Sequence, residues 1–323
     1  MSGPAYLDTP LGASTESWFQ PMGLALRLET DSPEVRAAAE EAFRRFGPGP
    51  QSAETRADFT LRLFAHTVDD EMPLRTVLRA DGRLVYQTAG RGTTLVIDRE
   101  GGQGFGYLSP AVLGDRVFFR WHFLDLALFF FLEGRGFLGV HGAALARGGK
   151  ALLLRARSGA GKSTLVYAAS RRRFRALAED LVWLTPDGAT VWGMPWTFHL
   201  LPDAAGLFPE LADAEEVRHH VQHNGEAKLA VDLERMRPGS TTPSAELAGV
   251  VFLRREPGGR SRLEPAGPGE AWEEWLAGAA SRERSAPDYD RRTGDLLRAL
   301  PAHRLGLGDD LEEALDLLEP LLP

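Results

Sequence analysis

The chain has 323 residues, of which 43% are hydrophobic and 25% charged, the proportions of a globular protein with a substantial core. A formal net charge of −8 provides no global positive field, which excludes a non-specific nucleic-acid partner. The chain has no cysteine, which excludes disulfides and thiolate metal sites.

The first part of the chain, residues 1–115, has the pattern of a small α+β domain with a mostly antiparallel sheet. Residues 23–30 alternate as a strand does, and residues 33–46 place apolar side chains at helical spacing. Short strand candidates separated by turn residues follow at 59–64, 74–79, 83–87 and 94–97. No chemical constellation stands out here.

The most apolar stretch, residues 117–132, predicts a buried helix rather than a membrane span. It contains Arg120, His122 and Asp125, and its uninterrupted part is far shorter than the ~20 residues that cross a bilayer. Residues 1–8 have neither the basic start nor the apolar core of a signal peptide. We therefore expect a cytoplasmic protein without a membrane partner.

The character of the chain changes at about residue 116, and we predict a second, α/β domain over residues 116–323. Two apolar, strand-like runs, 136–146 and 150–156, are joined by a short glycine-containing turn at 147–149. The second run leads directly into a stretch of small residues and then a helix start.

That stretch has the form of a phosphate-binding loop. Gly159 and Gly161 allow positive φ, so that successive N–H groups can point at one polyphosphate. Lys162 would reach the β- and γ-phosphates of a nucleotide such as ATP, and the Ser163 hydroxyl would bind its Mg²⁺. The usual first glycine of the motif is Ala156 here. The predicted nucleotide-binding residues are Ser158, Gly159, Ala160, Gly161, Lys162, Ser163 and Thr164.

An acidic pair, Glu179 and Asp180, falls inside the apolar, strand-like run 174–184, about seventeen residues after Lys162. Buried charges are costly unless they are paired with a cation. A Mg²⁺·nucleotide on the adjacent loop is the candidate, with one carboxylate on the metal and the other free to accept a hydroxyl proton.

Later basic residues are less specific. His219, His220 and His223 could suggest a metal site, but their acidic, loop-like surroundings favour solvated side chains. Lys228, at the start of a strand, could carry positive charge toward a transferring phosphate, and a plain surface lysine is an equally good interpretation. Amphipathic helices are predicted from 269–276 and 309–322.

Three segments in order give the second part of the chain a resemblance to the HPr kinase-like serine kinases. They are 140–145 with His141 before the loop, 158–164 in it, and 178–182 with the acidic pair after it. The family shows a histidine on the hairpin, a loop of form S-G-x-G-K-S and a D-D pair. The resemblance covers residues 116–260 and is clearest over 138–184.

The resemblance implies a P-loop kinase fold related to phosphoenolpyruvate carboxykinase, which uses Mg²⁺ and ATP to phosphorylate a serine hydroxyl. Lys162 and Ser163 then match the nucleotide and Mg²⁺ ligands, Glu179 the general base and Asp180 the carboxylate facing the metal. His141 matches the histidine near the transferred phosphate, and Lys228 loosely matches a late basic residue. Glu179 replaces the family's first aspartate, and no counterpart of its phosphorolysis signature follows 193–199.

The leading hypothesis is an ATP-dependent kinase acting on a serine of a protein or ribosomal peptide precursor, a peptide-tailoring type of function with residues 1–115 as substrate recognition. The partner is then the protein or peptide that carries this serine, and a homo-oligomer is allowed. Two alternatives stay open: a small-molecule kinase acting on free serine or a related alcohol, and a non-catalytic nucleotide-binding switch.

Overall fold

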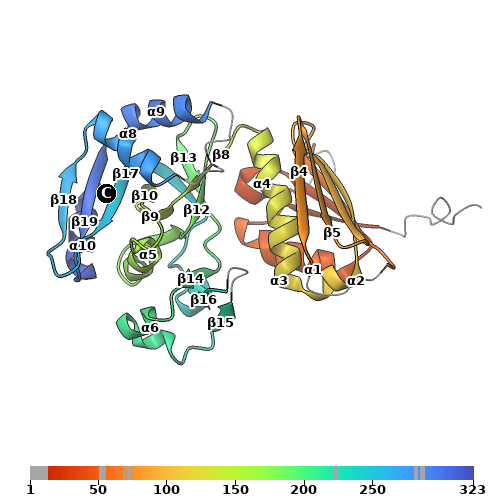
Figure 1. Ribbon diagram of the computed structural model, residues 1–323, viewed down its shortest axis with the longest axis horizontal. Helices are drawn as coiled ribbons and strands as arrows, with labels where there is room; N and C mark the ends of the chain where they lie inside the picture. The colour runs from red at the N-terminus through yellow and green to blue at the C-terminus, as the bar shows by residue number, and fades with distance from the viewer. Residues whose placement is uncertain are drawn as a thin grey trace, which may run out of the picture. The chain divides into compact units, whose positions relative to one another are not determined.

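A computed structural model describes residues 14–50, 56–68, 70, 74–221, 225–279, 283 and 288–323. The fold is mixed α/β with several sheets, and the chain divides into two compact units, Met1–Gly136 and Phe137–Pro323 (Figure 1). None of the described helices is long and apolar enough to cross a bilayer.

The first unit is an open sheet covered by helices. Its strands are β1 (Thr15–Phe19), β2 (Leu26–Thr30), β3 (Phe59–Ala65), β4 (Thr76–Asp81), β5 (Leu84–Ala89), β6 (Thr93–Asp98) and β7 (Gln103–Leu108). Its helices are α1 (Pro33–Phe43), α2 (Pro110–Gly114), α3 (Arg116–Phe119), the π-helical η4 (Arg120–Leu124) and α4 (Asp125–Gly134). The described strands lie in the order β1-β2-β3-β7-β6-β5-β4, and β3 runs parallel to both of its neighbours.

Helix α4 belongs to this first unit. Phe131 stacks on Phe59 of β3 with ring centroids 4.9 Å apart, and the Arg135 guanidinium donates to the carbonyls of Asp58 and Glu100. The division between the units therefore follows Gly136, whereas the sequence places a domain boundary at residues 115 and 116. The apolar helix that opens the predicted second domain packs on the first sheet.

The second unit contains a large sheet and a small one. The strands are β8 (Leu138–His141), β9 (Ala143–Arg147), β10 (Lys150–Arg155), β11 (Arg175–Ala178), β12 (Leu181–Leu184), β13 (Thr190–Trp192), β14 (Phe198–Leu200), β15 (Val217–Val221), β16 (Ala227–Val231), β17 (Ser244–Arg255), β18 (Arg262–Pro265) and β19 (Ala302–Leu307). The helices are α5 (Lys162–Ser170), α6 (Ala204–Leu207), α7 (Leu233–Met236), α8 (Pro268–Ala277), α9 (Tyr289–Ala299) and α10 (Leu311–Leu318).

The large sheet has the order β11-β9-β10-β17-β13-β12-β8, with β19 added beside β17 and β18 beside β19. Strands β10, β17 and β19 run parallel at its centre. Side chains of β10 alternate between two cores: Leu152 and Leu154 pack with α5 and α10, while Ala151 and Leu153 pack with α8 and α9. Burial on both faces explains why β10 is apolar throughout.

Two runs predicted as single strands are each broken. The run 136–146 divides at Gly142 into β8 and β9, which pair with different strands, β12 and β10. The run 174–184 divides at the acidic pair into β11 and β12. The carboxylates therefore lie in a connection, where backbone and side chains can turn to separate partners.

The histidine-rich segment also differs from expectation. His219 and His220 lie on β15 of the small sheet β14-β16-β15, where a loop was predicted, and His223 lies outside the described residues. Among the described residues, no group of three or more histidine or acidic side chains could hold a metal ion.

Candidate functional site

The predicted phosphate loop connects the end of β10 to the first turn of α5. Gly159 has φ +80° and Gly161 has φ +93°, the left-handed region that favours glycine. A Cβ on Gly161 would lie 3.1 Å from Leu307 Cδ2, whereas one on Gly159 would meet nothing within 4 Å. Gly161 precedes α5 as its N-cap, so the amides of the first helical turn open toward the loop.

Ala156 occupies the position of the usual first glycine without backbone strain. It is buried, and it does not take a positive φ. An alanine therefore suffices at the end of this strand.

Lys162 is folded back into its own loop. Its Nζ donates to the carbonyl of Ala156 at 3.1 Å and lies 3.4 Å from that of Arg157. The residue is only 6% exposed, and burial lowers the pKa of its ammonium group, an effect that the charge of Asp180 opposes. These two carbonyls hold the ammonium group inside the loop. If a nucleotide binds there, its phosphates would replace the carbonyls as partners of Lys162.

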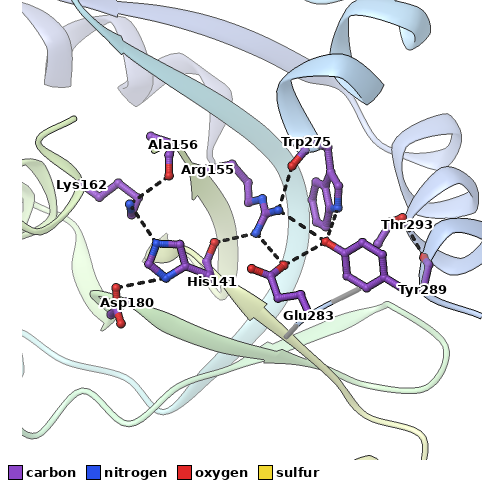
Figure 2. A network of polar contacts seen from close by, with 9 residues as sticks. All are labelled: His141, Arg155, Ala156, Lys162, Asp180, Trp275, Glu283, Tyr289 and Thr293. Carbon is purple, nitrogen blue, oxygen red and sulfur yellow. Dashed lines mark hydrogen bonds and ion pairs between the residues drawn. The ribbon is translucent and has the colours of Figure 1, made fainter. Parts of the chain in front are cut away.

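His141 connects Lys162 to the acidic pair (Figure 2). Its Nε2 lies 3.5 Å from Lys162 Nζ, and its Nδ1 lies 3.2 Å from Asp180 Oδ1. An Nδ1–H that donates to Asp180 leaves the Nε2 lone pair facing the ammonium group. The structure thus brings together Lys162, His141 and Asp180, which the sequence placed in three separate motifs.

Gly142 joins His141 to the backbone of the acidic connection. Its N–H donates to the carbonyl of Asp180 at 2.8 Å, which ties the acidic connection to the end of β8. A Cβ at this position would approach the Leu154 carbonyl oxygen to 3.0 Å, a tighter contact than most side chains make, so this close approach of the backbone favours glycine.

Glu179 points to a different partner from that of Asp180. Its Oε1 accepts from the backbone N–H of His199 at 2.6 Å and lies 2.7 Å from His199 Nδ1. The Glu179 side chain is 12% exposed, against 71% for Asp180. Burial raises the pKa of Glu179, although the hydrogen bonds and charge of His199 oppose the rise. One carboxylate is thus exposed beside Lys162 and the other is sheltered and oriented.

The remaining predicted residues have less defined surroundings. Ser163 and Thr164 lie in the first turn of α5, after the loop residues Ser158 and Ala160. Lys228 lies on β16 of the small sheet and pairs with Glu226 at 3.2 Å. Within the described ranges, no hydrogen bond or ion pair joins Lys228 to Lys162 or His141.

The donors around the loop fit a nucleotide with a hard cation. The Ser163 hydroxyl and the Asp180 carboxylate are oxygen ligands of the kind Mg²⁺ takes when waters and phosphate oxygens complete its shell. The two positive-φ glycines supply the backbone form of an anion-binding concavity.

The sequence pattern assigns no role to two residues that contact the candidate site, His199 and Arg155. The contact of His199 with Glu179 joins residues twenty positions apart. Arg155 lies within the predicted strand-like run 150–156 and has no predicted role, yet it is fully buried and ion-paired with Glu283 at 3.0 Å. A charge directly after four apolar residues was the available signal.

No protein-family model matches the chain, and no curated protein matches it either. Among solved structures, the chain is similar to the HPr(Ser) kinase/phosphatase from Coxiella burnetii, with 12% identity and a TM-score of 0.29. The match covers 57% of this chain and 87% of that one. Similarity at this level assigns neither a family nor a function.

Proposed function

We propose that this chain is a Mg²⁺- and ATP-dependent phosphotransferase that transfers the γ-phosphate to a serine hydroxyl, as a distant relative of the HPr kinase-like serine kinases. The observation that carries the proposal is the contact chain Lys162–His141–Asp180 at the mouth of a glycine-rich strand-to-helix loop (Figure 2). A cation, a titratable imidazole and a carboxylate meet where the phosphates would lie.

The loop would hold the phosphates. The N–H groups between Gly159 and the first turn of α5 would donate to phosphate oxygens, and Lys162 would exchange the Ala156 carbonyl for the β- and γ-phosphates. Mg²⁺, held by Ser163 Oγ and Asp180, would offset the negative charge on the phosphates. His141 would face the transferred group, with its orientation fixed by the carboxylate of Asp180.

Glu179 would accept the proton of the attacking hydroxyl. The acceptor oxygen forms a bond to the γ-phosphorus as the bond to the β,γ-bridging oxygen breaks, and ADP leaves with that electron pair. A general base works best with a pKa near the working pH, and burial moves the pKa of Glu179 in that direction. The contact with His199 fixes the geometry of this base.

The proposed acceptor is a serine in a protein or a ribosomal peptide precursor, with the first unit as the recognition module. Transfer from γ-labelled ATP with Mg²⁺ into host-cell extract, separated by size, tests this assignment, and Lys162→Ala provides the control. Label in protein or peptide is the expected result. Label in the small-molecule fraction would favour a metabolite kinase, and ATP binding without transfer would favour a nucleotide-binding switch.

A further inference from the structure

Arg155 places a positive charge in the core directly before the phosphate loop. It is the last residue of β10, and none of its surface is exposed. By the alternation along β10, it follows Leu153 onto the face covered by α8 and α9. A buried guanidinium is costly unless its donors and its charge are matched.

On the α8 and α9 side, three residues bind this guanidinium. Its Nη1 pairs with Glu283 Oε2 at 3.0 Å, and its Nη2 donates to the carbonyl of Trp275 at 2.9 Å. Its Cζ also lies 4.3 Å from the centroid of the Trp275 ring, within the range of a cation–π contact. The Tyr289 hydroxyl lies 3.5 Å from Nη2.

The Tyr289 hydroxyl connects the other members of a buried cluster that consists of Arg155, Trp275, Glu283 and Tyr289. It accepts from Trp275 Nε1 at 2.8 Å and donates to Glu283 Oε2 at 2.9 Å, the oxygen that pairs with Arg155. Burial raises the pKa of Tyr289, so the hydroxyl keeps the proton that it donates. The partners of Arg155 thus bind both Nη atoms, while its buried Nε has no hydrogen-bond partner among the described residues.

On the other side, the same guanidinium contacts the site. Its Nη1 donates to the carbonyl of His141 at 2.6 Å, and the next residue, Ala156, provides the carbonyl that binds Lys162. Figure 2 shows Arg155 between Lys162 and His141 on one side and Trp275 and Tyr289 on the other.

We propose that Arg155 is a positioning residue, through which Glu283, Trp275 and Tyr289 set the backbone of His141 and of the loop that holds Lys162. The inference rests on the proposed nucleotide site. It adds residues from the C-terminal part of the chain to those that position this site. If Arg155 served only to fill the core, it would not need a charge, because an apolar side chain would fill the same space without a desolvation penalty.

The experiment compares two variants that disturb the cluster, Tyr289→Phe and Glu283→Gln, with a matched control. Thr293→Val removes a buried hydrogen bond to the Tyr289 carbonyl on the same helix without touching Arg155. Two readouts are used on the full chain: hydrogen exchange of the amides of residues 156–163, and the affinity for a fluorescent ATP analogue with Mg²⁺.

We expect Tyr289→Phe and Glu283→Gln to speed exchange in the loop and to weaken nucleotide binding by roughly 2- to 30-fold, the range of coupling through a contact network. Thr293→Val should change neither quantity. If Glu283→Gln unfolds, Tyr289→Phe decides, because it leaves the ion pair in place. Unchanged exchange in a folded Tyr289→Phe variant would overturn the inference.

Arg155→Lys separates charge from geometry, since lysine keeps the charge but cannot reach these acceptors in one plane. We expect it to behave as Tyr289→Phe does, and wild-type behaviour would overturn a positioning role. If the wild-type chain binds no nucleotide, the proposed function fails, while the exchange data still decide whether Arg155 orders the loop.

Discussion

At the scale of single residues, the two adjacent carboxylates have opposite environments. Asp180 is exposed and faces His141, whereas Glu179 is sheltered and bonded to His199. The sequence predicts that an acidic pair accompanies the loop, because charges in an apolar run need a partner. The sequence cannot predict that the two carboxylates bind different partners. That difference depends on His199 of β14, which lies beside Glu179 only in the folded chain.

Lys162→Ala should abolish phosphate transfer and leave the fold intact. The ammonium group binds carbonyls of its own loop, so its removal leaves no buried charge without a counterion. Transfer from γ-labelled ATP measures the first effect and circular dichroism the second. Transfer at the wild-type rate would refute the assignment of Lys162 to the phosphates.

Glu179→Gln should lower turnover by roughly 10²- to 10⁴-fold, the range for a general base, with little loss of nucleotide affinity. A glutamine oxygen can still accept from the His199 amide, so the fold is preserved. Because the raised pKa belongs to the base, the wild-type rate should fall as pH falls through that pKa. The variant should lack this acidic limb in its pH–rate profile.

Asp180→Asn is the matched comparison for that variant. If Asp180 holds the cation, the substitution should raise the Mg²⁺ concentration required for activity. Equal loss of turnover and of Mg²⁺ affinity in Glu179→Gln would instead place Glu179 on the metal.

At the scale of elements, local patterns predicted some strands and missed others. Strands β3 and β6 follow apolar alternation and were predicted within two residues of their bounds. Strand β7 was missed because Gly104 and Gly106 interrupt its pattern. A Cβ on Gly104 would lie 2.7 Å from Leu61 Cδ1 of β3 and 3.2 Å from Phe131 Cζ of α4, so packing against residues distant in sequence favours glycine there. A prediction from a short stretch of sequence cannot detect contacts of this kind.

Asp125, the first residue of α4, should make the first unit less stable at neutral pH. Its Oδ1 is buried and has no hydrogen-bond partner among the described residues, and burial raises its pKa from 3.8 to about 6. Between these values the folded chain holds a proton that the unfolded chain has lost, so stability falls as pH rises. The loss amounts to roughly 3 kcal/mol and is complete above about pH 6.

Asp125→Asn should remove this loss. Urea unfolding followed by circular dichroism from pH 4 to 7 measures it, as the stability of the variant minus that of the wild type. We expect the difference to grow with pH and to level off above about 6. A difference independent of pH would contradict the burial of this carboxyl group in the folded chain.

At the scale of the whole molecule, the described candidate residues of the nucleotide site, Lys162, His141, Asp180 and Glu179, belong to the second unit. Residues 137–323 contain both cores that sandwich β10. Expressed alone, they should bind ATP with Mg²⁺ as the full chain does but lose transfer to a protein or peptide. Titration of the fluorescent nucleotide and the labelling assay check the two parts. Full transfer by the shorter chain would exclude recognition by the first unit.

The sequence could predict the strand, the glycine-containing turn and the helix start over 150–164, because this signal is local, with two glycines, a lysine and a preceding apolar strand within a dozen residues. It could not place the partners of Arg155, which follow it by 120 to 134 positions. Those contacts form only when α8 and α9 pack on the sheet. The hydrophobic periodicity of these helices does not indicate which charged side chain of the sheet they will contact.

The break at Gly142 has a consequence for how the protein folds. His141 ends β8, paired with β12 at the sheet's edge, while Ala143 begins β9, paired near the centre with β10. His141 therefore reaches its place only when strands some forty residues apart have closed on each other. Contacts of such separation slow folding, because the entropy of closing the long intervening loop is lost before the contacts form. A partly folded chain in which β8 has not yet paired with β12 thus has the glycine-rich loop without His141 beside Lys162.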